Sequence, residues 1–341
     1  MVDESELIEL RLLQLLESET KWWTNEELAA TLQLSKATTQ KYLNRLKLRL
    51  ENRAEDVRVA INSGKGVRFY RPASFNIQLL YSQILKELLT FNILDAFLYQ
   101  KQLSIVNLAL DNFSSVASIR RKYRTLNNYF SEMEIEIKNG GILGNERNIR
   151  WFYAKFYWKV FKGCEWPFRL VQRQELLHML DGVQKEFNFE IVPEVKEEFL
   201  FRMAINSVRF YKGYRVTTDK EIEKYATHNP IYERFIQVFG KIFPNEVKKQ
   251  SEENKTEMQF LFLLFSALPL LEKEENFSTA MYEAHKEGQT LMYQMTQDWL
   301  SLYEKNFQTS IYGLKRRELE IKLLRIHSYS YLYKKGGPLF F

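Results

Sequence analysis

The sequence predicts a mainly α-helical protein, with two winged helix-turn-helix domains in its N-terminal part and helical bundles after them. Three observations support this fold class. Apolar residues recur at helical spacing through most of the 341 residues. A helix–turn–helix pattern occurs twice in residues 1–160, at a spacing of 80. Each copy is followed by two β-prone runs around a turn that contains glycine, which is typical of a wing.

The first copy begins with a helix predicted over residues 4–19, where leucines recur on one face. Thr24 and Glu27 have the spacing of a capping box and predict the start of a short second helix. Ser35 caps a third helix that extends to about Leu50. The inward stripe of this third helix is predicted to be Thr39, Leu43, Leu46 and Leu50.

The outward face of this third helix carries short or donor-rich side chains, which suit base edges and phosphates. These DNA-binding candidates are Lys36, Thr38, Gln40, Lys41, Asn44 and Arg45. Residues 57–61 and 67–70 predict a hairpin wing, on which Lys65 and Arg68 would contact a phosphate. A small helical bundle with a solvated polar face is the alternative, and the wing argues against it.

The second copy repeats the turn of the first, since Leu28-Ala29 recurs as Leu108-Ala109 and Ser35 recurs as Ser115. A long apolar helix over residues 77–99 would supply its first helix. Its third helix is predicted from Ser115 to about Ser131 and would present its cations to DNA. The DNA-binding candidates here are Ser118, Arg120, Arg121, Lys122 and Arg124. Residues 134–143 would form the second wing around Asn139-Gly140-Gly141.

Charge and composition favour a DNA-binding protein and disfavour an enzyme. Residues 1–160 contain 23 Lys and Arg against 18 Asp and Glu, so the basic excess lies with the predicted heads. The sequence contains no His/Cys cluster with zinc spacing and no catalytic constellation, so we expect no metal, no cofactor and no enzymatic activity. Cys164 cannot form an internal disulfide and is expected to be a buried thiol.

The acidic start and the absence of a long apolar run predict neither a signal peptide nor a membrane span. We therefore expect a cytoplasmic protein.

Three segments resemble the Mga/AtxA-type virulence regulators of Gram-positive bacteria. They are residues 22–46 (WWTNEELAATLQLSKATTQKYLNRL), 112–130 (NFSSVASIRRKYRTLNNYF) and 142–158 (ILGNERNIRWFYAKFYW). The resemblance implies two helix-turn-helix units, two helical regulatory domains called PRDs, and a C-terminal domain similar to a phosphotransferase EIIB component. It implies control of virulence or carbohydrate-linked genes, double-stranded DNA as a partner, a homodimer and no membrane association.

The predicted domains are winged helix-turn-helix units at 1–73 and 74–162, and PRD-like helical domains at 163–275 and 276–341. A second repeat, at a spacing of 123, aligns Leu200–Gly213 with Leu323–Gly336, and the closing Lys-Gly would cap both helices. Against the family plan, the second PRD would be incomplete at Phe341 and the EIIB-like domain would be absent.

In the resembled family, PRD histidines are phosphorylated by the sugar phosphotransferase system, so a phosphocarrier protein is a possible partner. The candidates are His327, which lies in the repeat, and His228, which precedes Asn229-Pro230 in a predicted loop. For each, an ordinary structural or surface histidine is the alternative. Two other functions remain open at this point. They are an RNA-binding PRD antiterminator, and a scaffold whose winged helices bind proteins.

Overall fold

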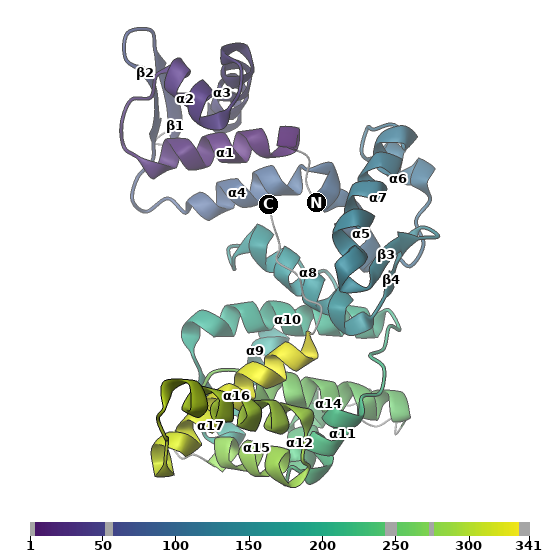
Figure 1. The fold of residues 1–341 in the computed structure, drawn as a ribbon. Coiled ribbons are helices and arrows are strands. Elements are labelled where there is room, and N and C mark those ends of the chain that lie inside the picture. The colour runs from purple at the N-terminus through teal and green to yellow at the C-terminus, as the bar shows by residue number, and fades with distance from the viewer. Residues whose placement is uncertain (1–3, 52–56, 243–250, 273–275, 334–341) are drawn as a thin grey trace.

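The computed structural model describes residues 4–51, 57–242, 251–272 and 276–333, and it confirms the mainly α-helical class. Figure 1 shows two small heads at one end of the molecule and a larger helical body at the other, with helix α8 between them. Within the described ranges, none of the helices is long and apolar enough to cross a membrane.

The first head contains three helices and a hairpin, as predicted. They are α1 (Glu4–Ser18), α2 (Asn25–Leu32), α3 (Lys36–Glu51), β1 (Arg58–Asn62) and β2 (Gly66–Tyr70). The capping box of α2 is complete, because the Thr24 amide donates to Glu27 Oε2 at 2.7 Å and the Glu27 amide donates to Thr24 Oγ1 at 3.1 Å. Trp23 and Val67 exchange two backbone hydrogen bonds of 2.8 and 2.7 Å, which tie the wing to the entrance of α2.

The second head has the same order of elements with one helix more. They are α4 (Ile77–Lys86), α5 (Leu89–Tyr99), α6 (Ile105–Asp111), α7 (Val116–Phe130), the 3₁₀ turn η1 (Ser131–Met133), β3 (Ile135–Lys138) and β4 (Gly141–Gly144). Asn139 (φ 53°) and Gly140 (φ 72°) form the two-residue turn between the strands, which requires positive φ at both positions.

The predicted single helix over residues 77–99 is wrong, because α4 ends at Lys86 and α5 starts at Leu89. Leu88 is extended, with ψ 137°, and its carbonyl accepts the amide of Asn92 in the new helix. The break lets α4 pack on α1 and α8 while α5 packs on α10. Neither glycine nor proline marks this position in the sequence, so tertiary packing sets it.

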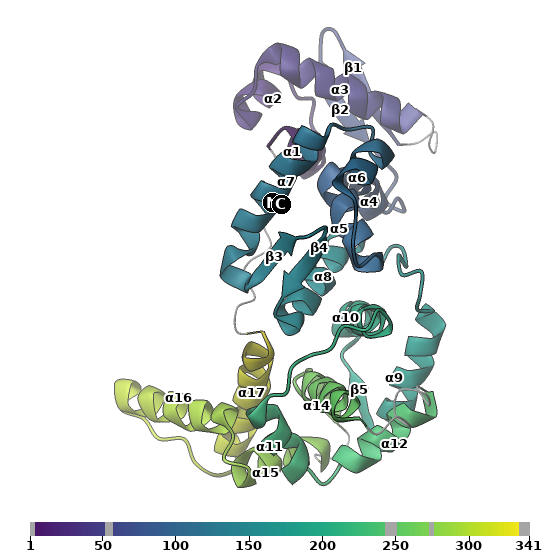
Figure 2. The same ribbon diagram turned by 90° about the vertical axis from the view of Figure 1, so that its right-hand side faces the viewer.

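Helix α8 (Glu146–Phe161) follows β4 directly and is buried along most of its length. It packs on α10 of the helical body, and Figure 1 shows the two helices next to each other. The body consists of α9 (Arg173–Phe187), α10 (Pro193–Tyr211), α11 (Lys220–His228), α12 (Tyr232–Ile242), α14 (Glu252–Ser266), α15 (Asn276–Glu287), α16 (Leu291–Phe307) and α17 (Gly313–Leu332). In Figure 2 one end of α17 lies toward α8, and the rings of Trp151 and Tyr333 are 6.4 Å apart.

Two short strands in the body were not predicted, β5 (Phe189–Ile191) and β6 (Leu270–Glu272), which pair antiparallel. Helix α15 packs on α11, and α17 packs on α14, so helices on both sides of the predicted boundary at 275 contact each other. Gly213 ends α10 with φ 80°, as the repeat predicts, whereas its counterpart Lys335-Gly336 lies outside the described residues.

Cys164 was predicted to be buried, but it is only half-buried. Its sulfur is 3.2 Å from the side-chain nitrogen Nδ2 of Asn76.

Candidate nucleic-acid interface

The two heads repeat each other in backbone geometry as well as in sequence. Ser35 caps α3 by accepting the Thr38 amide at 3.1 Å, and Ser115 caps α7 by accepting the Ser118 amide at 3.1 Å. The turn after the second helix of each pair contains a left-handed residue, with φ 57° at Gln33 directly after α2 and 47° at Phe113, two residues after the end of α6. Helix α7 therefore occupies in the second head the place that α3 occupies in the first.

Helix α7 presents an open cationic surface. Arg120, Arg121 and Arg124 are exposed, and within the described part of the chain their guanidinium groups have no ion pair or hydrogen bond. The expectation that Lys122 is exposed is wrong, because it is only 3% exposed. It lies three residues after Ile119 and four before Leu126, on the buried face of the helix. Because Lys122 stands among three exposed arginines in the sequence, it was predicted to share their exposed face, although its spacing from Ile119 and Leu126 places it on the buried one.

The candidates on α3 are largely engaged within the head. Lys36 Nζ lies 2.5 Å from Glu26 Oε1, and the Gln40 amide donates to Asn44 Oδ1 at 3.1 Å. Arg45 Nε lies 3.0 Å from Oε2 of the buried Glu9, a carboxylate that also holds Arg49. The Lys36 pair is exposed and therefore weak, so a phosphate can replace Glu26. In the Arg45 pair, by contrast, the partner Glu9 is buried in the head.

Other first-head candidates have mixed surroundings. Lys41 is exposed, and Thr38 is half-buried with its hydroxyl 2.8 Å from that of Ser35. Lys65 is exposed at the wing tip, where a phosphate can approach. Arg68 is half-buried, and its guanidinium carbon is 4.9 Å from the centroid of the Tyr70 ring. Helix α7 therefore offers a more continuous cationic surface than α3.

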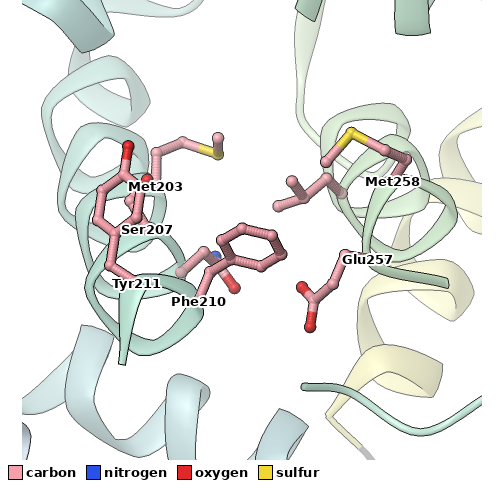
Figure 3. A pocket seen from close by; sticks show the side chains of 8 residues that line it. Met203, Ser207, Phe210, Tyr211, Glu257 and Met258 are labelled. Atoms are coloured by element: carbon pink, nitrogen blue, oxygen red, sulfur yellow. The ribbon is translucent and has the colours of Figure 1, made fainter. Parts of the chain in front are cut away.

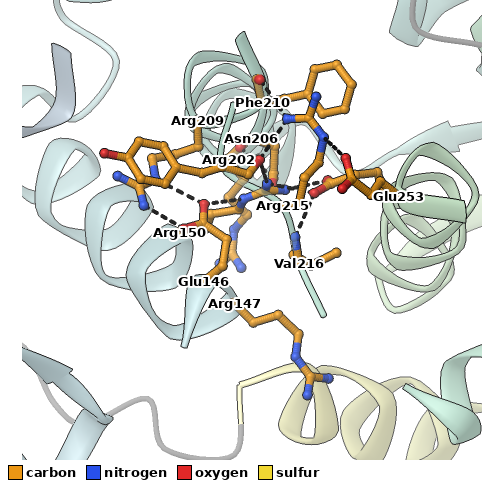
Figure 4. Close-up of polar contacts among 12 residues, drawn as sticks. Glu146, Arg147, Arg150, Arg202, Asn206, Arg209, Phe210, Arg215, Val216 and Glu253 are labelled. Atoms are coloured by element: carbon orange, nitrogen blue, oxygen red, sulfur yellow. Dashed lines mark hydrogen bonds and ion pairs between the residues drawn. The ribbon is translucent and has the colours of Figure 1, made fainter. Parts of the chain in front are cut away.

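A buried network of charges, shown in Figure 4, joins the second head to the body. Glu146, in the first turn of α8, accepts hydrogen bonds from Arg150 Nε at 2.9 Å and from Arg209 Nε at 3.0 Å. Arg150 Nη1 donates to Glu257 Oε2 of α14 at 2.7 Å. Burial lowers the pKa of Arg150, but the carboxylates of Glu257 and Glu146 more than offset this and hold that pKa above its ordinary value.

This network has no signal in the sequence, because its partners are far apart in the chain. The side chains of Arg150, Arg209 and Glu257 are at most 2% exposed. Two arginines and two glutamates face each other there, so the charges balance. A charged cluster at the wing-to-helix junction is therefore a structural link between the second head and the helical body.

A small cleft lies beside the network, between α10 and α14. Figure 3 shows Met203, Phe210 and Met258 around it, with Glu257 at its wall. Both carboxylate oxygens of Glu257 are already bonded, to Arg150 and to the Val216 amide. The cleft thus offers mainly apolar surface, and the carboxylate at its wall is already engaged. In the described parts of the chain, no group of three or more His, Cys, Asp or Glu is arranged to hold a metal ion.

The histidines lie in different environments. His228 is exposed, and its Nδ1 lies 2.7 Å from the Lys224 carbonyl oxygen. His327 is half-buried with Nδ1 2.8 Å from Thr296 Oγ1, and burial lowers its pKa. His285 is fully buried between Thr290 and Ser328, with its ring 4.3 Å from that of Tyr225. Burial lowers the pKa of His285 to about 3, so it is neutral and structural.

Comparison with known proteins places the second head in a described family. Residues 73–157, which contain α4 to α7, the second wing and most of α8, match the family model of the Mga helix-turn-helix domain.

Similar proteins extend the likeness beyond this head. The chain is 23% identical to the capsule synthesis positive regulator AcpB of Bacillus anthracis over 311 residues, which are 89% of this chain and 62% of that protein. It is 22% identical to the capsule synthesis positive regulator AcpA of the same organism, over 88% of this chain and 62% of that protein. The anthrax toxin expression trans-acting positive regulator is 23% identical over 60% of this chain and 42% of its own length. This chain thus spans less than two thirds of the length of these relatives.

Residues 73–157 therefore match the Mga helix-turn-helix domain, and the resemblance of this chain to the Mga/AtxA-type regulators is confirmed.

Proposed function

We propose that this protein binds duplex DNA and regulates transcription, with α7 as the main DNA-contacting helix. The observation that carries the proposal is the open row of Arg120, Arg121 and Arg124 on α7. A helix-turn-helix places such a helix in the major groove, where arginine binds guanine edges and phosphates. Helix α3 and the tip residue Lys65 add contacts to a neighbouring stretch of the same duplex. Lys122 is left out of the contacting set because it is buried.

We also propose that the regulation is positive. Three relatives are named positive regulators, two of capsule synthesis and one of anthrax toxin expression, and virulence genes are the corresponding targets for this chain. A homodimer with two heads per chain would contact an extended site. The mass of the protein–DNA complex in solution tests this stoichiometry.

The first experiment is a salt-titrated binding assay on random-sequence duplex DNA. The test variant is Arg120→Ala/Arg121→Ala/Arg124→Ala. The matched control is Lys305→Ala/Lys315→Ala/Lys322→Ala, which removes three exposed cations from α16 and α17. If each arginine contacts one phosphate, the slope of log K against log salt falls by roughly 3 in the test variant. It stays unchanged in the control. Equal losses in both variants, or no binding by the wild type at low salt, would exclude this interface.

We further propose His228 and His327 as acceptors of a phosphoryl group from a phosphocarrier protein. A carbonyl oxygen only accepts, so the Lys224 contact fixes the proton of His228 on Nδ1 and leaves the Nε2 lone pair as the nucleophile. Labelling the purified chain with a phosphorylated phosphocarrier tests this, with His228→Ala and His327→Ala as variants. The exposed His178 supplies the control, His178→Ala. Absence of label, or label unchanged in both variants, would remove the proposal.

A further inference from the structure

The two heads are joined to each other by polar contacts at two points. At the first point, Nη2 of Arg49 in α3 donates to Glu87 Oε2 at 2.7 Å, and its Nη1 donates to the other oxygen of that carboxylate. At the second point, the Tyr81 hydroxyl of α4 donates to Glu17 Oε2 of α1 at 2.8 Å. Helices α1 and α4 also pack on each other, as Figure 1 shows. These four residues form what we call the joint between the heads.

Arg49 is the side chain on which the first point depends. Its Nε donates to Glu9 Oε1 of α1 at 2.7 Å, so one guanidinium holds a carboxylate of each head. The Arg49 side chain is only 10% exposed, and its contact with Glu87 is bidentate, which is the geometry in which an ion pair contributes to stability. Burial lowers the pKa of Arg49, but its hydrogen bonds to Glu87 and Glu9 more than offset this and hold that pKa above its ordinary value.

Arg45, predicted to contact DNA, lies in the same cluster. Its Nε is 3.0 Å from Glu9 Oε2, and its Nη2 is 4.0 Å from Glu87 Oε2. Because Arg45 and Arg49 are one turn apart on α3, both arginines at this end of the helix are directed at the second head.

The two points of the joint are well separated along α1. The Arg49 contact reaches α1 at Glu9 and the Tyr81 contact reaches it at Glu17, so they are about 12 Å apart along the helix. Two contacts at such a separation fix the orientation of one head against the other, whereas a single contact could serve as a pivot.

Helix α4 is in turn fixed within the second head. Only Glu87 and Leu88 separate it from α5. It packs on α8, and Lys86 Nζ donates to Oε2 of Glu165, beyond the end of α8, at 2.6 Å. The first head therefore cannot turn against the second without breaking charged contacts.

A fixed joint limits which DNA the two heads can bind together. B-form DNA turns once in about 10.5 base pairs, so each extra base pair between two subsites rotates one against the other by about 34°. Flexibly linked heads follow such a rotation, whereas rigidly linked heads bind both subsites only at matching spacings. We infer that Arg49 and Glu87 fix the number of base pairs between the subsites of the two heads. This inference rests on the proposed function, in which both heads contact one duplex.

The test variant is Glu87→Ala, because it removes the carboxylate that Arg49 holds across the joint and leaves Glu9 with both of its arginines. The matched control is Glu19→Ala. Glu19 and Glu87 are each 54% exposed, but the ion pair of Glu19 is with Lys21 inside the first head. Each variant loses one negative charge, so a general effect of charge on DNA affinity is the same in both.

The measurement is an in vitro selection of duplex DNA with a randomised core several helical turns long. We expect the wild type and Glu19→Ala to enrich two motifs at one spacing, or at spacings one helical turn apart. Glu87→Ala should enrich the same motifs at spacings that spread over several base pairs. A single spacing in Glu87→Ala, variable spacings in the wild type, or one motif alone would overturn the inference. No enrichment by the wild type would overturn the proposed function and the inference with it.

The selected duplex then gives a quantitative check. Inserting half a helical turn, about 5 base pairs, between the two motifs should weaken wild-type binding roughly 100-fold, because the heads can no longer engage together. The same insertion should weaken binding by Glu87→Ala by less than about tenfold. Equal losses in the two proteins would overturn the inference.

A measurement without DNA separates the joint from DNA binding. Spin labels are attached at Ala30→Cys on α2 and Asn107→Cys on α6, both exposed positions, in a Cys164→Ser background. Pulsed electron paramagnetic resonance should give one narrow distance with the intact joint and a wider distribution in Tyr81→Phe/Glu87→Ala. Equal widths would overturn the inference even in a chain that binds DNA. A distance that widens in a chain without DNA binding would refute the proposed function instead, so the two failures are distinguishable.

Discussion

The hydroxyl of Tyr331 in α17 donates to the carboxylate of Asp219, with its oxygen 2.8 Å from Oδ1 and 3.0 Å from Oδ2. The same carboxylate lies 3.0 Å from Nη1 of Arg147 in α8. Burial raises the pKa of Asp219, but the Tyr331 hydrogen bond and the Arg147 charge outweigh it and hold that pKa below its ordinary value. Asp219 thus remains charged at neutral pH and joins the last described helix to the helix that follows the second wing.

Removing the Tyr331 hydroxyl tests this connection. Tyr331→Phe should lower the free energy of unfolding by about 1.5 kcal/mol, because it removes a hydrogen bond to a charged, half-buried carboxylate. Tyr312→Phe is the control, since Tyr312 is 77% exposed. Urea unfolding followed by circular dichroism measures both variants. Equal stability of the two would mean that the Tyr331 contact contributes nothing.

The buried network at Glu257 should be more sensitive. Glu257→Gln keeps the side-chain shape but removes a charge opposite the buried Arg150, and breaking one side of a buried ion pair costs about 3 kcal/mol or more. Glu252→Gln, on the exposed side of the same helix, should change stability by less than about 0.5 kcal/mol. Both values come from denaturant unfolding at neutral pH. A Glu257→Gln protein as stable as wild type would show that Arg150 relaxes into other contacts.

His285 predicts a pH dependence. A histidine titrates near pH 6.5 in the unfolded chain, and in the fold the pKa is lowered to about 3 by burial. Between these two values the unfolded chain binds one more proton than the folded chain, so stability falls as the pH decreases through this interval. The slope from this group is about 1.4 kcal/mol per pH unit.

The matched variant is His285→Gln, which does not titrate and can still hydrogen bond to Thr290. Its unfolding free energy should depend less steeply on pH between 6 and 4 than that of wild type, by roughly the same slope per unit. The measurement is a series of urea titrations across this range. Parallel pH profiles for the two proteins would contradict a buried, neutral His285.

Two glycines of the first wing differ in what a methyl group would meet. At Gly66, φ is +101° and an added Cβ would lie 2.2 Å from the Trp23 carbonyl oxygen. Gly66→Ala should therefore destabilise the first head by more than about 2 kcal/mol. At Gly64 the nearest atom is 3.7 Å away, so Gly64→Ala should be close to neutral. Hydrogen exchange of the β1 and β2 amides measures both, and similar protection in the two variants would contradict this assignment.

Much of the two heads was predictable because their signals are local. The capping pair Thr24 and Glu27 lies within one turn, and the Asn139-Gly140 turn lies within two residues. The inward stripe from Thr39 to Leu50 follows from helical spacing alone. The same spacing, applied to Ile119 and Leu126, would have identified Lys122 as buried.

The rest depends on residues that are distant in sequence. The break at Leu88 has no local signal, and strands β5 and β6 pair although the described helices α10, α11, α12 and α14 lie between them in the sequence. Arg150 meets Glu257 across 107 residues, and nothing near either residue indicates the other. A sequence pattern also does not show whether an arginine forms an ion pair within the fold. Arg45 and Arg120 were therefore equal candidates, although Arg45 pairs with Glu9 in the structure. That the arginines of α7 contact DNA stays a prediction.

The contact of α17 with α8 has a consequence for biosynthesis. The ribosome synthesises the chain from the N-terminus at about 5 to 20 residues per second. Tyr333 therefore becomes available to contact Trp151 only roughly 10 to 40 s after α8 has been synthesised. During that interval both winged heads have all of their own residues, while the Trp151 ring of α8 still lacks its Tyr333 contact. A translation product that stops before α17 would therefore carry two complete heads on a connecting helix that packs on α10 but whose Trp151 ring lacks its Tyr333 contact, which a chaperone or a protease can recognise.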